Sequence, residues 1–494
     1  MNKISACLVL AGVVSAAAAQ TNAPAARPMT LEDCISDALQ HNFDVRVERI
    51  EPIKAQISLD AAYAGYDPTL SVSGNHAYNE SGGSYSGGLI VPPSITDANN
   101  FNSSLGGTLP TGTQYSLNGN IGEAYGANNN QPLDTTSGSF GVSLDQPLLK
   151  NLWTDSTRLS ISAAKNQKKY SFQGLRLQLI TTISAVENAY YELIYARENL
   201  VVEQQALNLA QTQLDQDRQR VSVGSLAPLD VQQDESQVAQ SRANLIAAQY
   251  TLDSDENTLK NLITDDYVTW HALELKPTAK LEAVRQFLDL QDSWSKGMES
   301  RPDLLQAKLT LAQQGIQLKY DYNQLFPQLD MVASYGFNGS GREYSDALGQ
   351  MNEGNRPYYT YGGKLSIPLD NLAARSSYKS DKAVERQDLL KFKQLEQNVM
   401  VEIDNAVKQA QSSWESVDAT KEARIYAEAA LDAEQKKYKV GKSTTFTVLQ
   451  LQNNLTSARS SEIRAQANYQ EALTALAQQE GTTLERRHVD VSGK

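Results

Sequence analysis

The sequence predicts an α+β membrane protein built from two internal repeats, each with a short β-segment and a long α-helical hairpin. Three observations support this fold class: the chain repeats itself, each repeat carries a sustained 3.5-residue spacing of apolar side chains, and short segments alternate apolar with small or polar residues. The formal charge of -13 over 494 residues argues against a nucleic-acid-binding surface, which needs clustered Lys and Arg.

The N-terminus predicts an export signal over residues 1–19. Lys3 precedes an apolar run, and Ala17-Ala18-Ala19 forms an A-x-A cleavage site. No later run is apolar enough for a membrane-spanning helix, so we expect any crossing of a membrane to use β-strands. Cys34 is the one cysteine after the signal, and we expect it to be buried on the apolar face of a helix.

The repeat appears in two registers. Asn42-Phe43-Asp44-Val45 aligns with Arg301-Pro302-Asp303-Leu304 at an offset of 259 residues, and Val223-Gly224 aligns with Val440-Gly441 at an offset of 217. The offset shrinks because the first repeat carries 38 more residues between two matched prolines than the second. This insertion is rich in Gly, Asn and Ser, which is typical of surface loops or an added hairpin.

In each repeat, apolar and small residues recur at alternating spacings of four and three positions. This spacing predicts a long helix that packs as in a coiled coil. Each long helix ends near a glycine and a second helix follows, giving helical hairpins over residues 156–264 and 374–480. The positions that form the stripe are Leu175, Leu179, Thr182, Val186, Ala189, Leu193, Ala196, Leu200, Glu203, Leu207, Ala210, Leu214, Asp217 and Val221, then Val399, Ile403, Ala406, Ala410, Ser413, Val417, Thr420, Arg424, Ala427, Leu431, Glu434 and Tyr438.

Four segments predict β-strands: residues 69–78, 137–146, 329–338 and 358–367. Their length and alternation suit strands that cross an outer membrane, although a soluble antiparallel sheet has the same pattern. Four strands are too few to close a barrel, which takes about eight, so the membrane interpretation requires several chains to share one barrel. Leu105 to Ile121 also alternates, and either an extra hairpin, making six strands, or an extracellular flap fits it.

The predicted organisation has five parts. Residues 1–19 are the signal peptide, 20–264 the first repeat, 265–300 an equatorial connection, 301–481 the second repeat, and 482–494 a polar tail.

These features together resemble the TolC family of bacterial outer-membrane efflux proteins, from about Thr30 to Gly481. Each motif that carries the resemblance is weak alone, but their order and duplication make the match specific. The motifs are Thr30-Leu31-Glu32-Asp33, Ala38-Leu39, Asn42, Gln146-Pro147-Leu148-Leu149, Arg301-Pro302-Asp303-Leu304, Phe326-Pro327-Gln328-Leu329 and the two Val-Gly turns.

The resemblance implies a homotrimer whose strands share one β-barrel in the bacterial outer membrane, in contact with its lipid. The helical hairpins would form a coiled-coil tunnel through the periplasm. It also implies partners: a periplasmic adaptor (a membrane fusion protein) and an inner-membrane pump that supplies the energy. The expected function is the exit duct of a tripartite efflux pump or type I secretion system, passing small molecules or proteins passively.

The resemblance also assigns roles to the hairpin turns. The candidate adaptor-docking residues are Val223, Gly224, Ser225, Val440, Gly441 and Lys442. The candidate residues of the periplasmic aperture are Asp230, Gln233, Tyr438, Thr447 and Gln450. Some members carry paired aspartates where Thr447 and Gln450 stand here, so that acidic ring is absent from this place. Asp230, at the position equivalent to Thr447, and then Asp234 and Glu235 are either charges of the tip or solvated residues of a helix face, and we expect the latter. We expect Tyr438 either to latch the tip or simply to pack.

No catalytic pattern emerges. The four histidines lie apart in the sequence, without metal-ligand spacing, and no nucleophile elbow, Walker loop or dinucleotide fingerprint occurs. We therefore expect no enzyme activity, no cofactor and no metal. The alternative function is a secreted or periplasmic coiled-coil scaffold or adhesin without a pore.

Overall fold

The computed structural model of the protein describes residues 26–128 and 131–489. The predicted signal peptide lies outside these residues. The chain divides into two compact units. Unit 1 contains Met1–Phe43, Thr182–Gln286 and Gln409–Ala475, and unit 2 contains Asp44–Thr181, Phe287–Lys408 and Leu476–Lys494. Two long helices, α4 (Ser156–Ser222) and α10 (Leu372–Lys439), contribute to both units.

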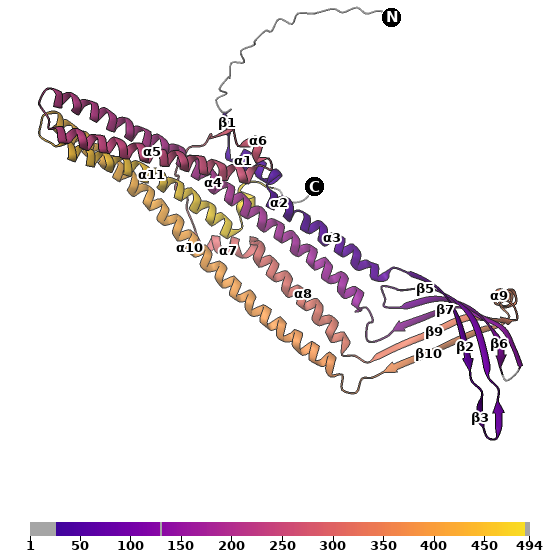
Figure 1. The fold of residues 1–494 in the computed structure, drawn as a ribbon. Coiled ribbons are helices and arrows are strands. Elements are labelled where there is room, and N and C mark those ends of the chain that lie inside the picture. Colours follow the sequence, from indigo (N-terminus) through magenta and orange to yellow (C-terminus); the bar gives the residue numbers. More distant parts are fainter. Residues whose placement is uncertain (1–25, 129–130, 490–494) are drawn as a thin grey trace, which may run out of the picture. The chain divides into compact units, whose positions relative to one another are not determined.

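Unit 2 contains an antiparallel sheet of six strands in the order β10-β9-β7-β6-β5-β2 (Figure 1). The strands are β2 (Thr69–Ser81), β5 (Ser94–Thr108), β6 (Gln114–Asn128), β7 (Gln131–Pro147), β9 (Gln328–Gly341) and β10 (Pro357–Ser366). A small hairpin of β3 (Ser84–Ser86) and β4 (Leu89–Val91) follows β2. The alternating segment Leu105 to Ile121 lies in β5 and β6, inside the sheet between β2 and β7, and is therefore not a flap.

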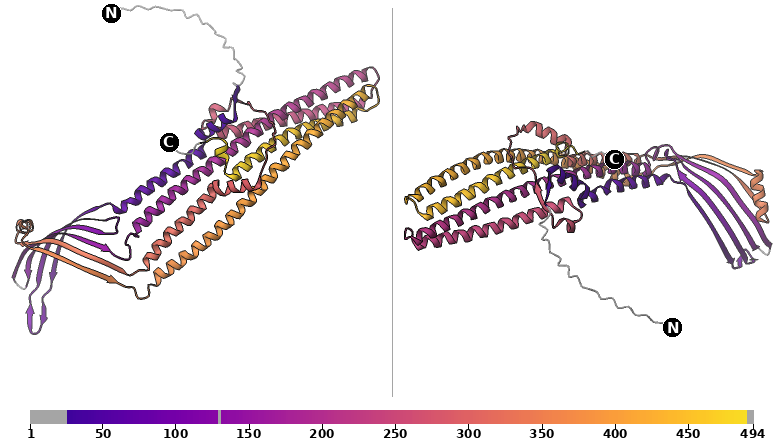
Figure 2. Two further views of the ribbon diagram at one scale, coloured as in Figure 1. Left: turned by 180° about the vertical axis from the view of Figure 1, so that it is seen from behind. Right: turned by 90° about the horizontal axis from the view of Figure 1, so that it is seen from above.

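Four helices of unit 2 run side by side and join the sheet (Figures 1 and 2). They are α3 (Ile50–Tyr63), the first part of α4, α8 (Pro302–Gln324) and the first part of α10. Side-chain amides link neighbours: Asn166 Nδ2 donates to the Leu309 carbonyl at 2.8 Å, and Gln314 Nε2 donates to the Asp381 carbonyl at 3.0 Å. The shorter helices of this unit are α2 (Phe43–Glu48), η1 (Ala64–Tyr66), α7 (Leu290–Ser300), α9 (Tyr344–Glu353) and α12 (Thr483–Arg486).

The apolar core of unit 2 lies where α8, α10 and the end of α11 (Thr445–Glu480) meet. Its buried members are Leu304, Val399, Ile403, Val407 and Leu476. Arg301 closes the core: its guanidinium donates to both oxygens of Asp303 at 3.0 and 2.6 Å, to Glu402 at 2.7 Å and to the Gln479 side chain at 2.8 Å. Pro302 follows at the first turn of α8, where its missing N–H costs no hydrogen bond.

Unit 1 consists mainly of two helical hairpins that lie side by side (Figure 2). One pairs α4 with α5 (Pro228–Ile263), and the other pairs α10 with α11. The long helices have 67 and 68 residues and the second helices 36 each, as expected for repeats of one ancestral hairpin. Unit 1 also holds α1 (Leu31–His41), α6 (Tyr267–Trp270) and a parallel pair of short strands, β1 (Ala26–Met29) and β8 (Glu274–Pro277).

The seam between the hairpins is partly polar. Val186, Leu193 and Leu207 from the predicted stripe are buried, but buried Glu187 also accepts a hydrogen bond from the Thr474 hydroxyl at 2.6 Å. Arg464 donates to both oxygens of Glu192. These side-chain pairs satisfy polar groups that would otherwise destabilise a narrow interface.

Residues 265–300 include α6, β8 and α7, and β8 pairs with β1. After residue 482, α12 buries Thr483 and Leu484. The prediction that Cys34 is buried is confirmed: its side chain is fully enclosed, and burial raises the pKa of its thiol to about 12.

Replacing Ile403 with alanine should lower the free energy of unfolding by about 2–5 kcal/mol, because it leaves a cavity in the core of unit 2. Thermal unfolding in detergent, followed by circular dichroism, measures the loss. Lys393→Ala, at an exposed position of the same helix, is the matched control and should unfold at the wild-type temperature. Equal melting of the two variants would contradict this account of the core.

Candidate functional site

The two faces of the six-stranded sheet differ in chemistry. One residue of each strand lies in a row across the sheet, and every member of this row is apolar and between 37% and 69% exposed. The row is Leu70, Leu105, Leu117, Val142, Tyr335 and Tyr359. We call the face that carries it the apolar face.

The next rows on either side project from the opposite face, because successive residues of a strand alternate. One is Thr69, Gly106, Ser116, Ser143, Ser334 and Thr360, and the other is Ser71, Ser104, Asn118, Gly141, Gly336 and Tyr358. We call this the polar face. An exposed apolar face opposite a polar one is the pattern of strands that separate lipid from water.

Both edges of the sheet are unpaired within the described residues. β2 hydrogen-bonds only to β5 in this sheet, and β10 only to β9. Open edges of this length attract further strands. No helix within residues 26–128 and 131–489 is long and apolar enough to cross a membrane.

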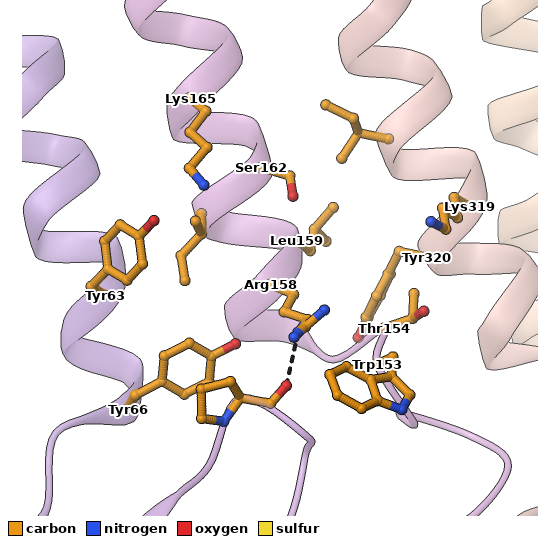
Figure 3. A pocket seen from close by; sticks show the side chains of 13 residues that line it. Tyr63, Tyr66, Trp153, Thr154, Arg158, Leu159, Ser162, Lys165, Lys319 and Tyr320 are labelled. Carbon is orange, nitrogen blue, oxygen red and sulfur yellow. Dashed lines mark hydrogen bonds between the residues drawn. The ribbon is translucent and has the colours of Figure 1, made fainter.

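Where the strands of unit 2 join the helices, a cavity of about 430 Å³ opens between α3, α4 and α8 (Figure 3). Arg158 lies in it: its Nε donates to the Pro110 carbonyl at 2.8 Å, and its guanidinium carbon lies 4.8 Å from the centre of the Trp153 ring. Pro110 belongs to the turn between β5 and β6. The charged side chains that line the cavity, Arg158, Lys165 and Lys319, are all cationic.

The hairpin turns of unit 1 have the same geometry in both repeats. Gly224 and Gly441 adopt φ of 76° and 74°, a left-handed conformation that favours glycine. The N–H groups of Ser225 and Lys442 donate to the carbonyls of Arg220 and Lys437 at 2.8 and 2.9 Å. This is the Schellman pattern of helix termination.

Each turn also presents apolar side chains to solvent. Val223 is 78% exposed and Val440 is 68% exposed. Leu229 and Phe446, each 64% exposed, follow the two valines by about six residues and are related by the same 217-residue offset. The sequence analysis did not single out Leu229 and Phe446. The signal that could have found them is a large apolar residue at the equivalent position after both turns. Paired exposed apolar residues are typical of a protein-docking surface.

The predicted aperture residues lie in different environments. Asp230 and Gln233 are half-buried in the first turns of α5, Thr447 is half-buried in α11, and Gln450 is exposed. The Thr447 N–H donates to the Thr444 hydroxyl at 3.3 Å, which caps α11.

Tyr438 joins the two hairpins. It is 7% exposed, and its hydroxyl donates to Asp217 Oδ2 at 2.7 Å. The Thr445 hydroxyl lies 2.9 Å from the Tyr438 hydroxyl, and the Arg220 guanidinium carbon lies 4.5 Å from the centre of the Tyr438 ring. Gln213 Nε2 also donates to Asp217 Oδ2 at 2.7 Å. Tyr438 thus packs and also makes a specific bond between the repeats.

Asp234 is fully buried beside Asp217, so the expectation that it is a solvated helix-face residue was wrong. Glu235, the next residue, is half-exposed and pairs with Arg218 at 2.7 Å. Within the described part of the chain neither Asp234 oxygen has a hydrogen-bond partner. Burial, then the charge of Asp217, raises the pKa of Asp234 to about 7. A proton on Asp234 removes the repulsion between its carboxyl group and the charge of Asp217.

A sequence profile of the Outer membrane efflux protein family matches residues 34–264 and 295–482. The chain therefore belongs to this family. Membership assigns it to the outer-membrane efflux channels, a transport class rather than an enzyme class.

Several characterised proteins are similar to the chain. Outer membrane protein TolC of Escherichia coli (strain K12) is 27% identical over 302 residues, which cover 58% of this chain and 59% of that protein. TolC of Salmonella enteritidis is 26% identical over 390 residues, which cover 75% of each chain. Pyoverdine export outer membrane protein OpmQ of Pseudomonas aeruginosa is 25% identical over 333 residues, which cover 66% of each chain.

Solved structures share the fold. The CmeC outer membrane channel of Campylobacter jejuni has a TM-score of 0.66 at 14% identity, covering 92% of this chain and 86% of that one. The open state of the MtrE outer membrane channel of Neisseria gonorrhoeae has a TM-score of 0.65 at 18% identity, covering 92% and 89%.

Asp234→Asn should remove the pH dependence that Asp234 gives to the stability of unit 1. Between about pH 4 and 7 the folded protein keeps a proton that an unfolded aspartate has lost, so wild-type stability falls as pH rises through this window. The variant should equal the wild type near pH 4 and exceed its free energy of unfolding by about 1–3 kcal/mol at pH 8.

Thermal unfolding of both proteins at a series of pH values measures the effect. Glu235→Gln is the control, because its carboxylate is half-exposed, and it should keep the wild-type profile. If the stability of Asp234→Asn and that of the wild type changed with pH in parallel, burial beside Asp217 would not disfavour the charged form of Asp234.

Proposed function

We propose that three copies of this chain form an exit duct through the bacterial outer membrane, closing their sheets into one β-barrel and their helices into a periplasmic tunnel. Small molecules or proteins would pass through it passively, with the energy supplied by an inner-membrane pump and an adaptor. One observation supports this proposal above all: the exposed apolar row from Leu70 to Tyr359, opposite polar rows.

The edges of unit 2 favour association with further copies of the chain. β2 and β10 are the two edge strands, so β2 of one protomer can pair with β10 of the next. The helix α3 at the β2 edge, with α2 before it, exposes a stripe of Val47, Ile50, Ile53 and Ile57, each at least 52% exposed. A neighbouring protomer that pairs with β2 would cover this stripe. A ring of protomers would pair the open sheet edges and also cover the exposed apolar stripe.

A pore-free scaffold or adhesin explains these observations less well. It would leave the apolar face of the sheet in water, where burial in lipid gains roughly 25 cal/mol for each Å². Neighbours could cover the sheet edges, but not its whole apolar face.

The hairpin turns are proposed as the docking surface for the adaptor. The paired apolar side chains at Val223 and Leu229, and at Val440 and Phe446, offer two similar patches on each protomer. The glycines stop both helices tightly, so these side chains stand at the extreme ends of the hairpins. Tyr438 and the Asp217–Asp234 pair lie within the same hairpins and are proposed to hold the aperture residues in a closed arrangement.

Arginine substitutions on the two faces of the sheet test the membrane assignment. Val142→Arg and Leu117→Arg should reduce assembly into the outer membrane, because arginine on a lipid-facing strand costs about 2–4 kcal/mol near the bilayer midplane. Ser143→Arg and Ser116→Arg are the adjacent controls; they should assemble normally and change the ion selectivity of the channel.

Outer-membrane fractionation measures assembly, and conductance in planar bilayers measures the pore. A wild-type protein that is soluble, monomeric and non-conducting would overturn the proposal. So would equal assembly of all four variants.

Aspartate substitutions at Val223 and Val440 test the docking surface. Loss of a central apolar contact typically weakens an interface by 1–2 kcal/mol or more, so dye efflux from cells should fall about tenfold while trimers still form. Gln240→Asp, at an exposed position of α5, is the control and should export normally. Wild-type efflux by the double variant would place the docking surface elsewhere.

A further inference from the structure

The helices of unit 2 carry a band of positive charge next to the sheet. The band consists of Arg158, Lys165, Lys168 and Lys169 of α4 and Lys308 and Lys319 of α8. No acidic residue interrupts α4 from Ser156 to Phe172. Within the described residues none of these side chains forms an ion pair, whereas Lys54 of α3 pairs with Glu51 at 2.7 Å. The band therefore stands out in a chain whose formal charge is -13.

Three of these cations line the cavity at the strand–helix junction, together with aromatic rings (Figure 3). Arg158 and Lys165 come from α4 and Lys319 from α8. The rings belong to Tyr63, Tyr66, Trp153 and Tyr320. The Arg158 guanidinium carbon lies 4.8 Å from the centre of the Trp153 ring, and Lys165 Nζ lies 5.7 Å from that of the Tyr63 ring. Both cations thus lie at aromatic faces, which attract them without neutralising their charge.

The acidic groups near the cavity do not compensate these cations. Among the described residues no carboxylate belongs to the lining of the cavity. Asp155, just before α4, is buried, and its Oδ1 accepts a hydrogen bond from the Arg158 N–H at 2.7 Å. This carboxylate therefore caps the helix, where the N-terminal dipole favours it. An anion that entered the cavity would meet three cationic side chains and no competing carboxylate in the wall.

The cavity lies at one end of the strands. Tyr66 precedes Leu70 of the exposed apolar row by four residues, which is at most about 14 Å of extended chain. Trp153 lies between the end of β7 at Pro147 and the start of α4. Tyr and Trp together with Lys and Arg are the side chains that gather at the headgroup level of a bilayer. A membrane that covered the apolar face would therefore place headgroups at this cavity.

Further lysines extend the positive charge along the helices. Lys168 and Lys169 follow Lys165 by about one helical turn, or about 5 Å. With Lys308 they line a second cavity of about 690 Å³, which Lys165 also lines. The spacing of one turn lies within the Debye length of about 8 Å at physiological salt, so these charges reinforce the attraction for an anionic surface.

We propose that the cavity at the strand–helix junction binds the phosphate headgroup of an anionic phospholipid. The occupant is a lipid rather than a free phosphate, because the cavity lies where the strands begin and carries the aromatic residues of a membrane interface. A zwitterionic headgroup also carries an ammonium group, for which the wall offers no carboxylate, so the site should prefer a headgroup of net negative charge. This inference rests on the proposed membrane-spanning sheet but not on trimer formation, since one protomer supplies the whole lining.

Lys165→Gln combined with Lys319→Gln tests the site. The full chain in detergent is mixed with equal amounts of phosphatidylglycerol and phosphatidylethanolamine of the same acyl chains, and native mass spectrometry counts the retained lipids. The wild type should retain mainly phosphatidylglycerol. The double variant should bind this lipid about 5–25-fold more weakly, because each basic residue at an anionic surface gains about fivefold in affinity. Its binding of phosphatidylethanolamine should not change.

Lys382→Gln combined with Lys393→Gln is the matched control. Both lysines are exposed on α10 in the same unit and line neither cavity. The control removes the same charge and should keep the wild-type preference for phosphatidylglycerol. Equal loss of this lipid in the two double variants would mean that net charge alone attracts it, and would overturn the site.

Trp153 reports whether the lipid occupies the cavity. Phosphatidylglycerol with bromine atoms near the glycerol end of its chains should quench the fluorescence of the wild type more than the equivalent phosphatidylethanolamine does. Trp153→Phe should remove this difference, and so should the double substitution of Lys165 and Lys319. A difference that persists in Trp153→Phe would place the lipid elsewhere on the protein.

Inorganic phosphate distinguishes a lipid site from a site for a free anion. At equal concentration it should displace little phosphatidylglycerol, and equal binding of the two would overturn the lipid assignment. Retention of both lipids in equal amounts by the wild type would do the same. These measurements require neither a conducting pore nor a trimer. A soluble, monomeric wild type would overturn the proposed duct, whereas loss of lipid selectivity alone would overturn only this inference.

Discussion

A sheet with one exposed apolar face, one polar face and two unpaired edges is not stable in water as a single protomer. In this protein that constraint extends across six strands, because the apolar row keeps one register from Leu70 to Tyr359. Lipid can cover the apolar face, and strands of other protomers can pair with the edges. The contrast between the apolar and the polar face is therefore set by the alternation of side chains along each strand.

The helices meet a different requirement, since they bury few of their side chains in apolar clusters. Their cores are small, as in unit 2, where five buried apolar residues are closed by the hydrogen bonds of Arg301. In unit 1 polar pairs such as Glu187 with Thr474 lie within the seam. Such pairs contribute modest net stability but fix the register of the packing, because a shifted helix would leave buried groups unsatisfied.

Sequence periodicity was a good guide to the elements and a poor guide to their partners. The step of four and three predicted hairpins over 156–264 and 374–480, and the helices occupy 156–263 and 372–480 apart from their turns. The burial of Asp234 was missed because Asp217, which lies beside it, belongs to the other helix of its hairpin. The four-residue β1–β8 pair was too short to leave a periodic signal.

The place of hairpin β5–β6 was open for a related reason. Gly, Asn and Ser alternate only weakly with its few apolar residues, so its sequence fitted a flap as well as a strand pair. The pairing partners β2 and β7 decide between the two, and they are visible only in the folded sheet.

The unequal repeats have a consequence for symmetry. In a ring of three protomers the hairpin turns would follow nearly sixfold order, since each chain supplies two turns of one geometry. The membrane sheet would be strictly threefold, because only one repeat carries the insertion. The turns themselves differ in charge, with Ser225 in one and Lys442 in the other. A sixfold assembly meeting this ring would therefore find two alternating classes of site, and its subunits would be chemically identical but not equivalently bound.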